Sequence, residues 1–398
     1  MTIIVKMATL AIGRCAMTSD DLAANLKRVR GAKGVSQDRL AALAGLSRSA
    51  YRNIEGGKVE PRVRSLEAIA RGLGVPVREL LQPARDLRHV RFRSSRKLRT
   101  RRQILSDVGR WLDDYSALEE LIGARRPFRL QGVAMEVVAQ DRGVVAARMA
   151  RAAMGLSADE TIRDICGLLD SAGVKVFPKP VASDGFFGLS VGPVDGGPAV
   201  VVNTWERISV ERWIFSAAHE LGHLLLHLDD YEHERDEEDA VREREADAFA
   251  AEFLMPDGVF QREWEETYGL SLVDRVIKVK RIFRVSYRTV LHRLAPTYEG
   301  WGNIWARFYA EYKRATGRSL LRSDEPSALE AAAFASAAPE ALRGHEPDHL
   351  STGDFREDRL SGLVRRAIEA EAISLGRGAE ILGLSLMDMR ARSASWVR

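Results

Sequence analysis

The sequence predicts a mainly α-helical protein with a small β-sheet, that is, an α+β fold. Short blocks of helical periodicity fill residues 20–82, and two longer helices are expected over 212–228 and 240–256. Two segments rich in β-branched and aromatic residues, GFFGLSV and PAVVVN, are separated by a DGG turn signal and predict a β-hairpin. With 398 residues, 45% of them hydrophobic, the chain is long enough for several domains with real cores.

Composition excludes several classes of protein. No run approaches 18 apolar residues, which argues against a transmembrane helix. Two cysteines, Cys15 and Cys166, cannot build a disulfide framework or a Cys-rich zinc cluster. Residues 1–17 are expected to be a loose extension and not a signal peptide, because Arg14 interrupts the region where small cleavage-site residues should lie. We therefore expect a cytoplasmic protein without membrane contact.

The net charge of +4 conceals a strong asymmetry along the chain. Residues 1–105 hold 23 Lys and Arg against 8 Asp and Glu, a charge of +15, so the remaining residues carry −11. Such a division predicts a basic end that faces nucleic acid and a body with a different task.

Residues 18–82 are expected to form an all-α domain that contains a helix-turn-helix. Ser36 is a natural N-cap for the block QDRLAALA, which Gly45 ends. Ser47 caps the next block, RSAYRNIE, which Gly56 and Gly57 end. Two short helices joined by a tight turn with glycine make this motif. The alternative is a helical bundle whose basic face is merely solvated.

The phrase SQDRLAALAGLSRSAYRNIEGGKVEP resembles the Xre/Cro-like repressors, which insert the start of the second helix into the major groove of double-stranded DNA. Arg can grip a guanine edge at two points, and Asn can do the same for adenine. The resemblance makes Gln37, at the start of the first helix, a phosphate-contact candidate. The base-facing candidates that it implies are Arg48, Ser49, Arg52 and Asn53.

Residues 83–139 are assigned to a basic arm or linker followed by helices. Within them, residues 85–102 hold nine bases and one acid, and their alternation is typical of a strand or an extended arm. Contact with the DNA backbone and a charged interdomain linker remain equal alternatives for this run.

A metal site is predicted in the helix over residues 212–228, which contains HELGH. His219 and His223 are four residues apart, so both imidazoles project from one helix face toward one ion. Glu220 lies beside that ion, where it can take a proton from water. Such polar residues in an apolar helix would cost energy without a partner, which favours a genuine Zn²⁺ site.

The third ligand is expected on the helix over residues 240–256, where Glu243, Glu245 and Asp247 compete. A catalytic zinc takes three protein ligands and keeps one open position. Glu243 and Asp247 share one face, so Glu243 is assigned as the ligand and Asp247 as the acceptor of a histidine N–H. Glu245 is the alternative ligand.

The motifs HELGHLLLH and EREADAFAAEFLMP resemble the ImmA/IrrE zinc metallopeptidases over about residues 140–295. The resemblance implies a gluzincin-like domain with His219, His223 and Glu243 as zinc ligands and Glu220 as the base. His227, one further turn along, has two interpretations: a residue that lines the cleft or, the favoured one, a helix-surface residue. Residues 296–398 are predicted to be a helical C-terminal region. Its segment 373–391 suggests a helix, a glycine turn and a second helix, and its low charge favours contact with protein over DNA.

The leading hypothesis is a DNA-binding transcriptional regulator fused to a zinc-dependent endopeptidase that cleaves a regulatory protein such as a repressor. The alternative is a repressor or antitoxin whose peptidase-like domain senses a signal, or binds a partner such as a toxin, without proteolysis. A third hypothesis, pure DNA binding with an inactive second domain, conflicts with the complete set of site residues. A homodimer is left open.

Overall fold

The computed structural model describes most of the chain, in two compact units. The described residues are 19–81, 87, 90–94, 101–133, 141–228, 240–297, 301–321, 324–326 and 350–396. The first unit comprises Met1–Leu87 and Lys97–Leu121, and the second comprises Arg88–Arg96 and Ile122–Arg398. The predicted extension 1–17, the acidic stretch 229–239 and the segment 327–349 lie outside the described residues.

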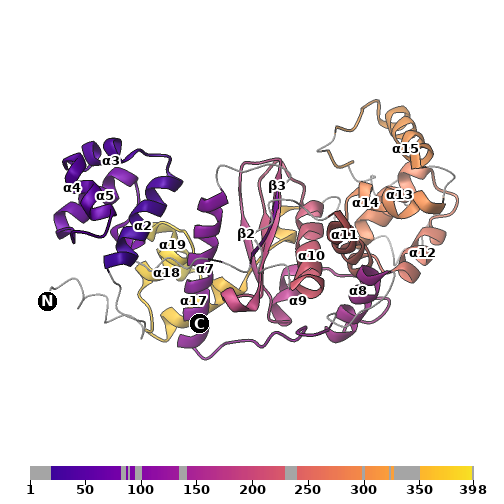
Figure 1. Cartoon of the computed structure of the whole chain (residues 1–398). Helices are drawn as coiled ribbons and strands as arrows, with labels where there is room; N and C mark the ends of the chain where they lie inside the picture. Colours follow the sequence, from indigo (N-terminus) through magenta and orange to yellow (C-terminus); the bar gives the residue numbers. More distant parts are fainter. Residues whose placement is uncertain are drawn as a thin grey trace. The chain divides into compact units, whose positions relative to one another are not determined.

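The first unit is entirely helical in its described part (Figure 1). Its core is built by apolar residues at helical spacing, among them Leu26, Leu40, Tyr51 and Ile69, all fully buried. The helices are α2 (Ser19–Ala32), α3 (Gln37–Leu43), α4 (Arg48–Glu55), α5 (Val63–Leu73), α6 (Val77–Leu81) and α7 (Arg101–Leu121).

Helices α3 and α4 form the predicted helix-turn-helix. The Ser36 side chain accepts a hydrogen bond from the Arg39 N–H, and the Ser47 side chain accepts one from the Ala50 N–H. Gly45 lies between them with φ of 64°, a left-handed conformation that glycine adopts without steric cost. The two serine caps and this glycine therefore set the turn locally, as the sequence predicts.

A four-stranded mixed sheet forms the centre of the second unit. Its strands are β1 (Val90–Ser94), β2 (Lys175–Lys179), β3 (Phe186–Val191) and β4 (Ala199–Asn203). Their order is β1-β3-β4-β2, with β3 antiparallel to both neighbours and β2 parallel to β4. The predicted β-hairpin is confirmed as β3 and β4. The basic run contributes β1, a pairing that neither sequence alternative anticipated because strand partners are non-local.

Helices α10 (Val210–Leu226) and α11 (Ala240–Leu254) pack against each other, and α10 also packs on β3 and β4 (Figure 1). Gly222 of α10 faces the ring of Phe249 on α11 at such close range that an added Cβ would lie 3.0 Å from the nearest ring carbon. Helix α8 (Arg142–Ala153) packs on α11 in the same way, with Gly143 against the backbone of Glu245. Small residues therefore let three helices approach closely.

The remaining helices of the second unit are α9 (Ile165–Ser171), α12 (Asp257–Glu266), α13 (Leu272–Phe283), α14 (Tyr287–Leu294), α15 (Trp301–Thr316), α17 (Arg359–Glu369), α18 (Leu375–Ile381) and α19 (Leu386–Ala394). The C-terminal region is anchored to the rest of the unit by Phe355, which packs edge-on against Trp213, and by Arg359, which pairs with Asp170 at 2.7 Å. Helices α18 and α19, with Gly383 left-handed between them, match the predicted helix, glycine turn and helix.

The structure confirms the predicted mainly helical α+β fold. The expected helices over 212–228 and 240–256 are α10 and α11, each ending two residues earlier than the apolar pattern. None of the described helices is both long and apolar enough to cross a membrane.

An alanine at Gly143 is expected to destabilise the second unit by about 1–3 kcal/mol, because its Cβ would collide with the Glu245 carbonyl and force α8 and α11 apart. Gly258 in α12 has nothing within 4 Å of an added Cβ, so Gly258→Ala is the matched control and should be neutral or slightly stabilising. Urea unfolding midpoints measure both effects. Equal midpoints for the two variants would contradict the close helix packing.

Candidate functional site

The HELGH motif lies on the buried face of α10, where the helix repeat places His219 and His223 one turn apart. Both histidines are fully buried, and Glu220 is 1% exposed. The helix begins after Ser209 and has Glu211 in its first turn, where a negative charge interacts favourably with the helix dipole. Leu221 and Leu224 of the same helix belong to the large hydrophobic core cluster of the second unit, beside which the motif lies.

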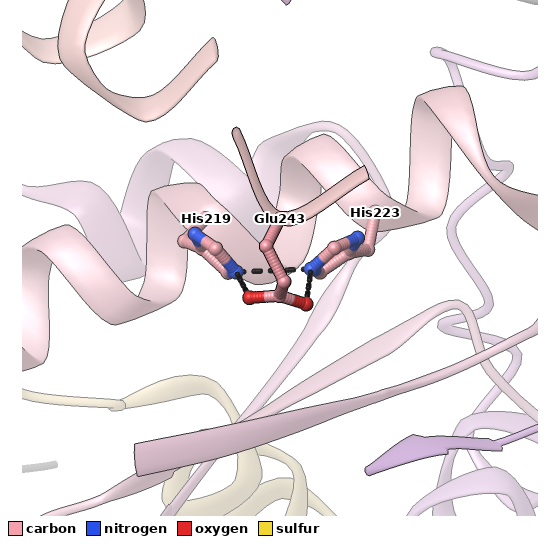
Figure 2. A group of neighbouring side chains, drawn as sticks. All are labelled: His219, His223 and Glu243. Carbon is pink, nitrogen blue, oxygen red and sulfur yellow. Dashed lines mark hydrogen bonds and ion pairs between the residues drawn. The ribbon is translucent and has the colours of Figure 1, made fainter. Parts of the chain in front are cut away.

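Helix α11 brings the Glu243 carboxylate to the two imidazoles (Figure 2). Glu243 Oε2 lies 3.3 Å from His219 Nε2, and Oε1 lies 3.3 Å from His223 Nε2. The two Nε2 atoms are 2.9 Å apart. These three residues are a group in which one potential ligand atom from each lies within 4.8 Å of the others.

A hydrogen bond on the outer side of each imidazole determines which nitrogen carries the proton. His219 Nδ1 lies 2.8 Å from Asp247 Oδ1, so Nδ1–H donates to that carboxylate. His227 Nε2–H donates to Glu245 Oε2 at 2.8 Å, which leaves the His227 Nδ1 lone pair to accept from His223 Nδ1–H at 2.9 Å. In this assignment, both Nε2 lone pairs point toward the Glu243 carboxylate.

Lone pairs and a carboxylate that converge in this way repel one another unless a cation lies between them. Burial lowers the pKa of His223 well below its ordinary value, although the contact with Glu243 opposes this. Burial also lowers the pKa of His227 to about 4. Burial alone would raise the pKa of Glu243, but its contacts with His219 and His223 hold it far below the ordinary value. Neutral imidazoles with one carboxylate are a donor set that fits a divalent metal ion.

Strand β3 positions the predicted base, Glu220. The Ser190 hydroxyl donates a hydrogen bond of 2.9 Å to Glu220 Oε2. Gly188 passes so close that an added Cβ would lie 3.0 Å from Glu220 Oε1. The carboxylate is thus fixed between α10 and the backbone of β3, immediately beside the two histidines in sequence.

Sequence reasoning favoured the wrong position for His227 and missed Arg91. His227, expected on the helix surface, is 3% exposed and lies just beyond the end of α10, where it links His223 to Glu245. Arg91 of β1 places Nη2 at 3.0 Å from Glu243 Oε1. The spacing H-x-x-x-H after the first motif was a signal for His227, whereas only the strand-like alternation of the basic run pointed toward Arg91.

In the first unit, the predicted base-facing residues Arg48, Ser49, Arg52 and Asn53 are all exposed on α4. Arg48 forms an ion pair of 2.6 Å with Asp38, and both side chains are largely exposed. Solvent weakens this ion pair, so Arg48 can exchange Asp38 for a DNA contact at little cost in free energy.

Gln37, the phosphate-contact candidate, is oriented by the buried carboxylate of Glu55. Its amide donates to Glu55 Oε2, and Arg30 Nε donates to Oε1 at 2.6 Å. Tyr51 donates to the same carboxylate. Burial raises the pKa of Glu55, but the hydrogen bonds from Arg30 and Gln37 outweigh it, so the pKa falls below its ordinary value. The charged carboxylate therefore fastens α2, α3 and α4 together.

Comparison with known families agrees with this geometry in both units. Residues 169–295 match the peptidase family model described as the IrrE N-terminal-like domain, and residues 26–80 match the helix-turn-helix family model. The resemblance to ImmA/IrrE proteins with an N-terminal helix-turn-helix is confirmed. No curated protein and no solved structure matches the chain.

The IrrE-like domain, residues 169–295, contains the whole predicted metal group together with Glu220, Asp247 and the hairpin of β3 and β4. The family match supports a metallopeptidase-like domain, and the match over 26–80 supports DNA binding. Strand β1 precedes the matched range by some 75 residues.

Replacing Glu243 by Gln is expected to release bound divalent metal on dialysis, because a neutral amide cannot replace the carboxylate between the two imidazoles. Glu245→Gln is the matched control: it should keep one metal ion per chain with weaker affinity, since Glu245 acts through His227. Asp247→Asn should weaken metal affinity about 10–100-fold. Metal content against a graded chelator measures all three. A Glu245→Gln protein without metal beside a Glu243→Gln protein with full metal would reverse the ligand assignment.

Proposed function

We propose that this protein is a DNA-binding transcription regulator whose IrrE-like domain is a zinc-dependent endopeptidase acting on a regulatory protein such as a repressor. The observation that carries the proposal is the position of Glu220. Its carboxylate is held by Ser190 on β3, and Glu220 stands between His219 and His223 of the predicted metal group in the HELGH motif. A purely structural metal site has no need of a carboxylate fixed in this place.

The donor set favours zinc among the divalent metals. Imidazole nitrogen suits zinc, whereas magnesium and calcium prefer oxygen ligands throughout. Two histidines and one carboxylate supply three protein ligands, the number that leaves a fourth position of a tetrahedral ion open. A bound zinc would polarise the scissile carbonyl and lower the pKa of water at that open position.

The chain's own residues would then carry the proton transfers of amide hydrolysis. Glu220 accepts the proton of the attacking water and passes it to the leaving amine. Ser190 holds one carboxylate oxygen, Oε2, by a hydrogen bond, which restricts rotation of the carboxylate. Asp247 and the pair of His227 and Glu245 hold the two imidazole rings in place through their outer nitrogens.

The helix-turn-helix would bind the protein to DNA and so place the peptidase near DNA-bound regulatory proteins. Four exposed polar side chains on α4 and the basic character of residues 1–105 suit contact with double-stranded DNA. Cleavage of a regulatory protein would explain why a DNA-binding domain and a peptidase-like domain occur in one chain. A repressor or antitoxin whose IrrE-like domain binds a partner without proteolysis is the competing outcome of the first experiment below.

Glu220→Gln is expected to retain fold and metal but to lose about 10²–10⁴-fold in the rate of polypeptide cleavage, because Gln cannot accept the proton. Fluorescein-labelled casein serves as a general unfolded substrate, and metal content is measured on the same sample. Glu265→Gln, on the exposed side of α12, is the control of equal charge change. Turnover by Glu220→Gln equal to wild type would remove Glu220 as the base. Absence of cleavage by the zinc-loaded wild type would favour the non-proteolytic alternative.

Arg48→Ala and Asn53→Ala are expected to lose about 1–3 kcal/mol of sequence preference if these side chains contact base edges. The measurement compares binding to a duplex selected by the wild type with binding to an unrelated duplex, over a range of salt concentrations. Arg62→Ala, an exposed position outside α4, should weaken both duplexes alike. Unchanged preference in both α4 variants would exclude this helix as the reader. Metal removal should leave DNA binding intact, because the metal group lies in the other unit.

A further inference from the structure

Strand β3 lies beside Glu220, so an extended polypeptide paired with β3 would pass close to that carboxylate. Two of its residues, Gly188 and Ser190, contact or closely approach the Glu220 carboxylate. Extended peptides commonly bind proteins by adding a strand to an exposed sheet edge, where main-chain hydrogen bonds supply affinity. One edge of β3 is taken by β4, so a polypeptide can pair only with the opposite edge.

In the structure, that opposite edge is covered by the chain's own strand β1. The strands are antiparallel, with Arg91 opposite Ser190 and Arg93 opposite Gly188. These are the two β3 positions next to Glu220. Strand β1 thus lies along the stretch of backbone that an extended substrate would use.

Arg91 extends this contact to the predicted metal group. Its guanidinium lies 3.0 Å from Glu243 Oε1, and the two side chains are only 15% and 14% exposed. The partial burial strengthens the attraction above that of a surface pair. Arg91 therefore fastens β1 at the carboxylate that is expected to hold the metal.

Strand β1 is suited to leave this edge. It lies outside residues 169–295, the range that matches the IrrE-like family model. In the described sheet, β1 is an edge strand that pairs with β3 alone, so its withdrawal disturbs no other strand pair. The strand lies between α6 and α7, both of which belong to the unit that contains the helix-turn-helix. The chain segment that follows the helix-turn-helix therefore includes the strand that pairs with the edge of β3.

We propose that residues 90–94 inhibit the IrrE-like domain from within the chain, by occupying the β3 edge and the Glu243 carboxylate until an extended polypeptide replaces them. This inference rests on the proposed peptidase function for its consequence, but the competition for the edge is measurable without catalysis. The linker would act as a substrate-like strand that competes with other extended polypeptides for the site.

The decisive experiment measures binding of a fluorescein-labelled peptide with the sequence of residues 88–96 to the full chain. In the wild type, the tethered strand has an effective concentration in the millimolar range and should exclude a micromolar peptide. Arg91→Ala removes the ion pair that fastens the strand and should bind the peptide at least tenfold more tightly than the wild type. Arg91→Lys, which keeps the charge, should lie between the two. Arg125→Ala, an exposed arginine elsewhere in the same unit, is the control of equal charge change.

Hydrogen exchange on the same proteins reports the strand pairing directly. Arg91→Ala should speed amide exchange in residues 90–94 and 186–191, and the added peptide should restore protection to 186–191. A control peptide with Ala in place of the arginine that corresponds to Arg91 should bind more weakly. Peptide binding and exchange that are the same in Arg91→Ala as in the wild type would overturn the proposal.

A reversible cross-link tests the inhibitory effect itself. Val90 and Val191 are opposite each other in the register, so Val90→Cys with Val191→Cys, in a Cys15→Ser background, should form a disulfide that locks β1 in place. Oxidation should abolish casein cleavage and reduction should restore it. In the control, Val191→Cys with Ala199→Cys joins β3 to β4 and should leave cleavage unchanged on oxidation.

The outcomes separate this inference from the proposed function. Cleavage that continues in the oxidised Val90–Val191 protein, or failure of that cross-link to form, overturns inhibition by β1. If no form of the protein cleaves casein, the peptidase function fails, and peptide binding still decides whether β1 occupies a strand-accepting edge. Tighter peptide binding by Arg91→Ala supports the proposal in that case as well.

Discussion

The close packing of α10 on α11 is the contact on which the candidate site depends. Gly222 lies within the HELGH motif and faces Phe249, so the two helix backbones approach closely at the level of the histidines. A larger residue at Gly222 would press on that ring and move the Glu243 carboxylate away from the imidazoles. Helix α8 also packs closely on α11, through Gly143, and contacts α10 as well. The packing of the core and the geometry of the candidate site therefore depend on the same helix contacts.

Hydrogen bonds around the site set the orientation and protonation of the two imidazoles. Asp247 and the pair of His227 and Glu245 take the outer protons of the two imidazoles, so the inner lone pairs meet the Glu243 carboxylate. Such an arrangement costs electrostatic energy in a buried place, and a divalent cation offsets that cost. The site is therefore prepared for a metal by groups that would not themselves contact it.

The basic run between the helix-turn-helix and the IrrE-like domain contributes to the protein in two ways. Its positive charge adds to the basic end of the chain, which suits contact with phosphate. Its alternation lets residues 90–94 join the sheet as β1 and places Arg91 at Glu243. The same residues that look like a linker in sequence are thus part of the surroundings of the candidate site.

Local features were sufficient to predict much of this protein. Serine caps and Gly45 define the helix-turn-helix within a few residues, and the i, i+4 spacing places His219 and His223 on one face of any helix. The sequence left Glu243 and Glu245 as alternative ligands, because their order depends on how α11 is rotated against α10. The burial of His227 and the pairing of Arg91 with Glu243 required contacts between segments far apart in the chain. The sequence by itself therefore determined the helices and the chemistry they carry, and only tertiary packing decided which side chains meet.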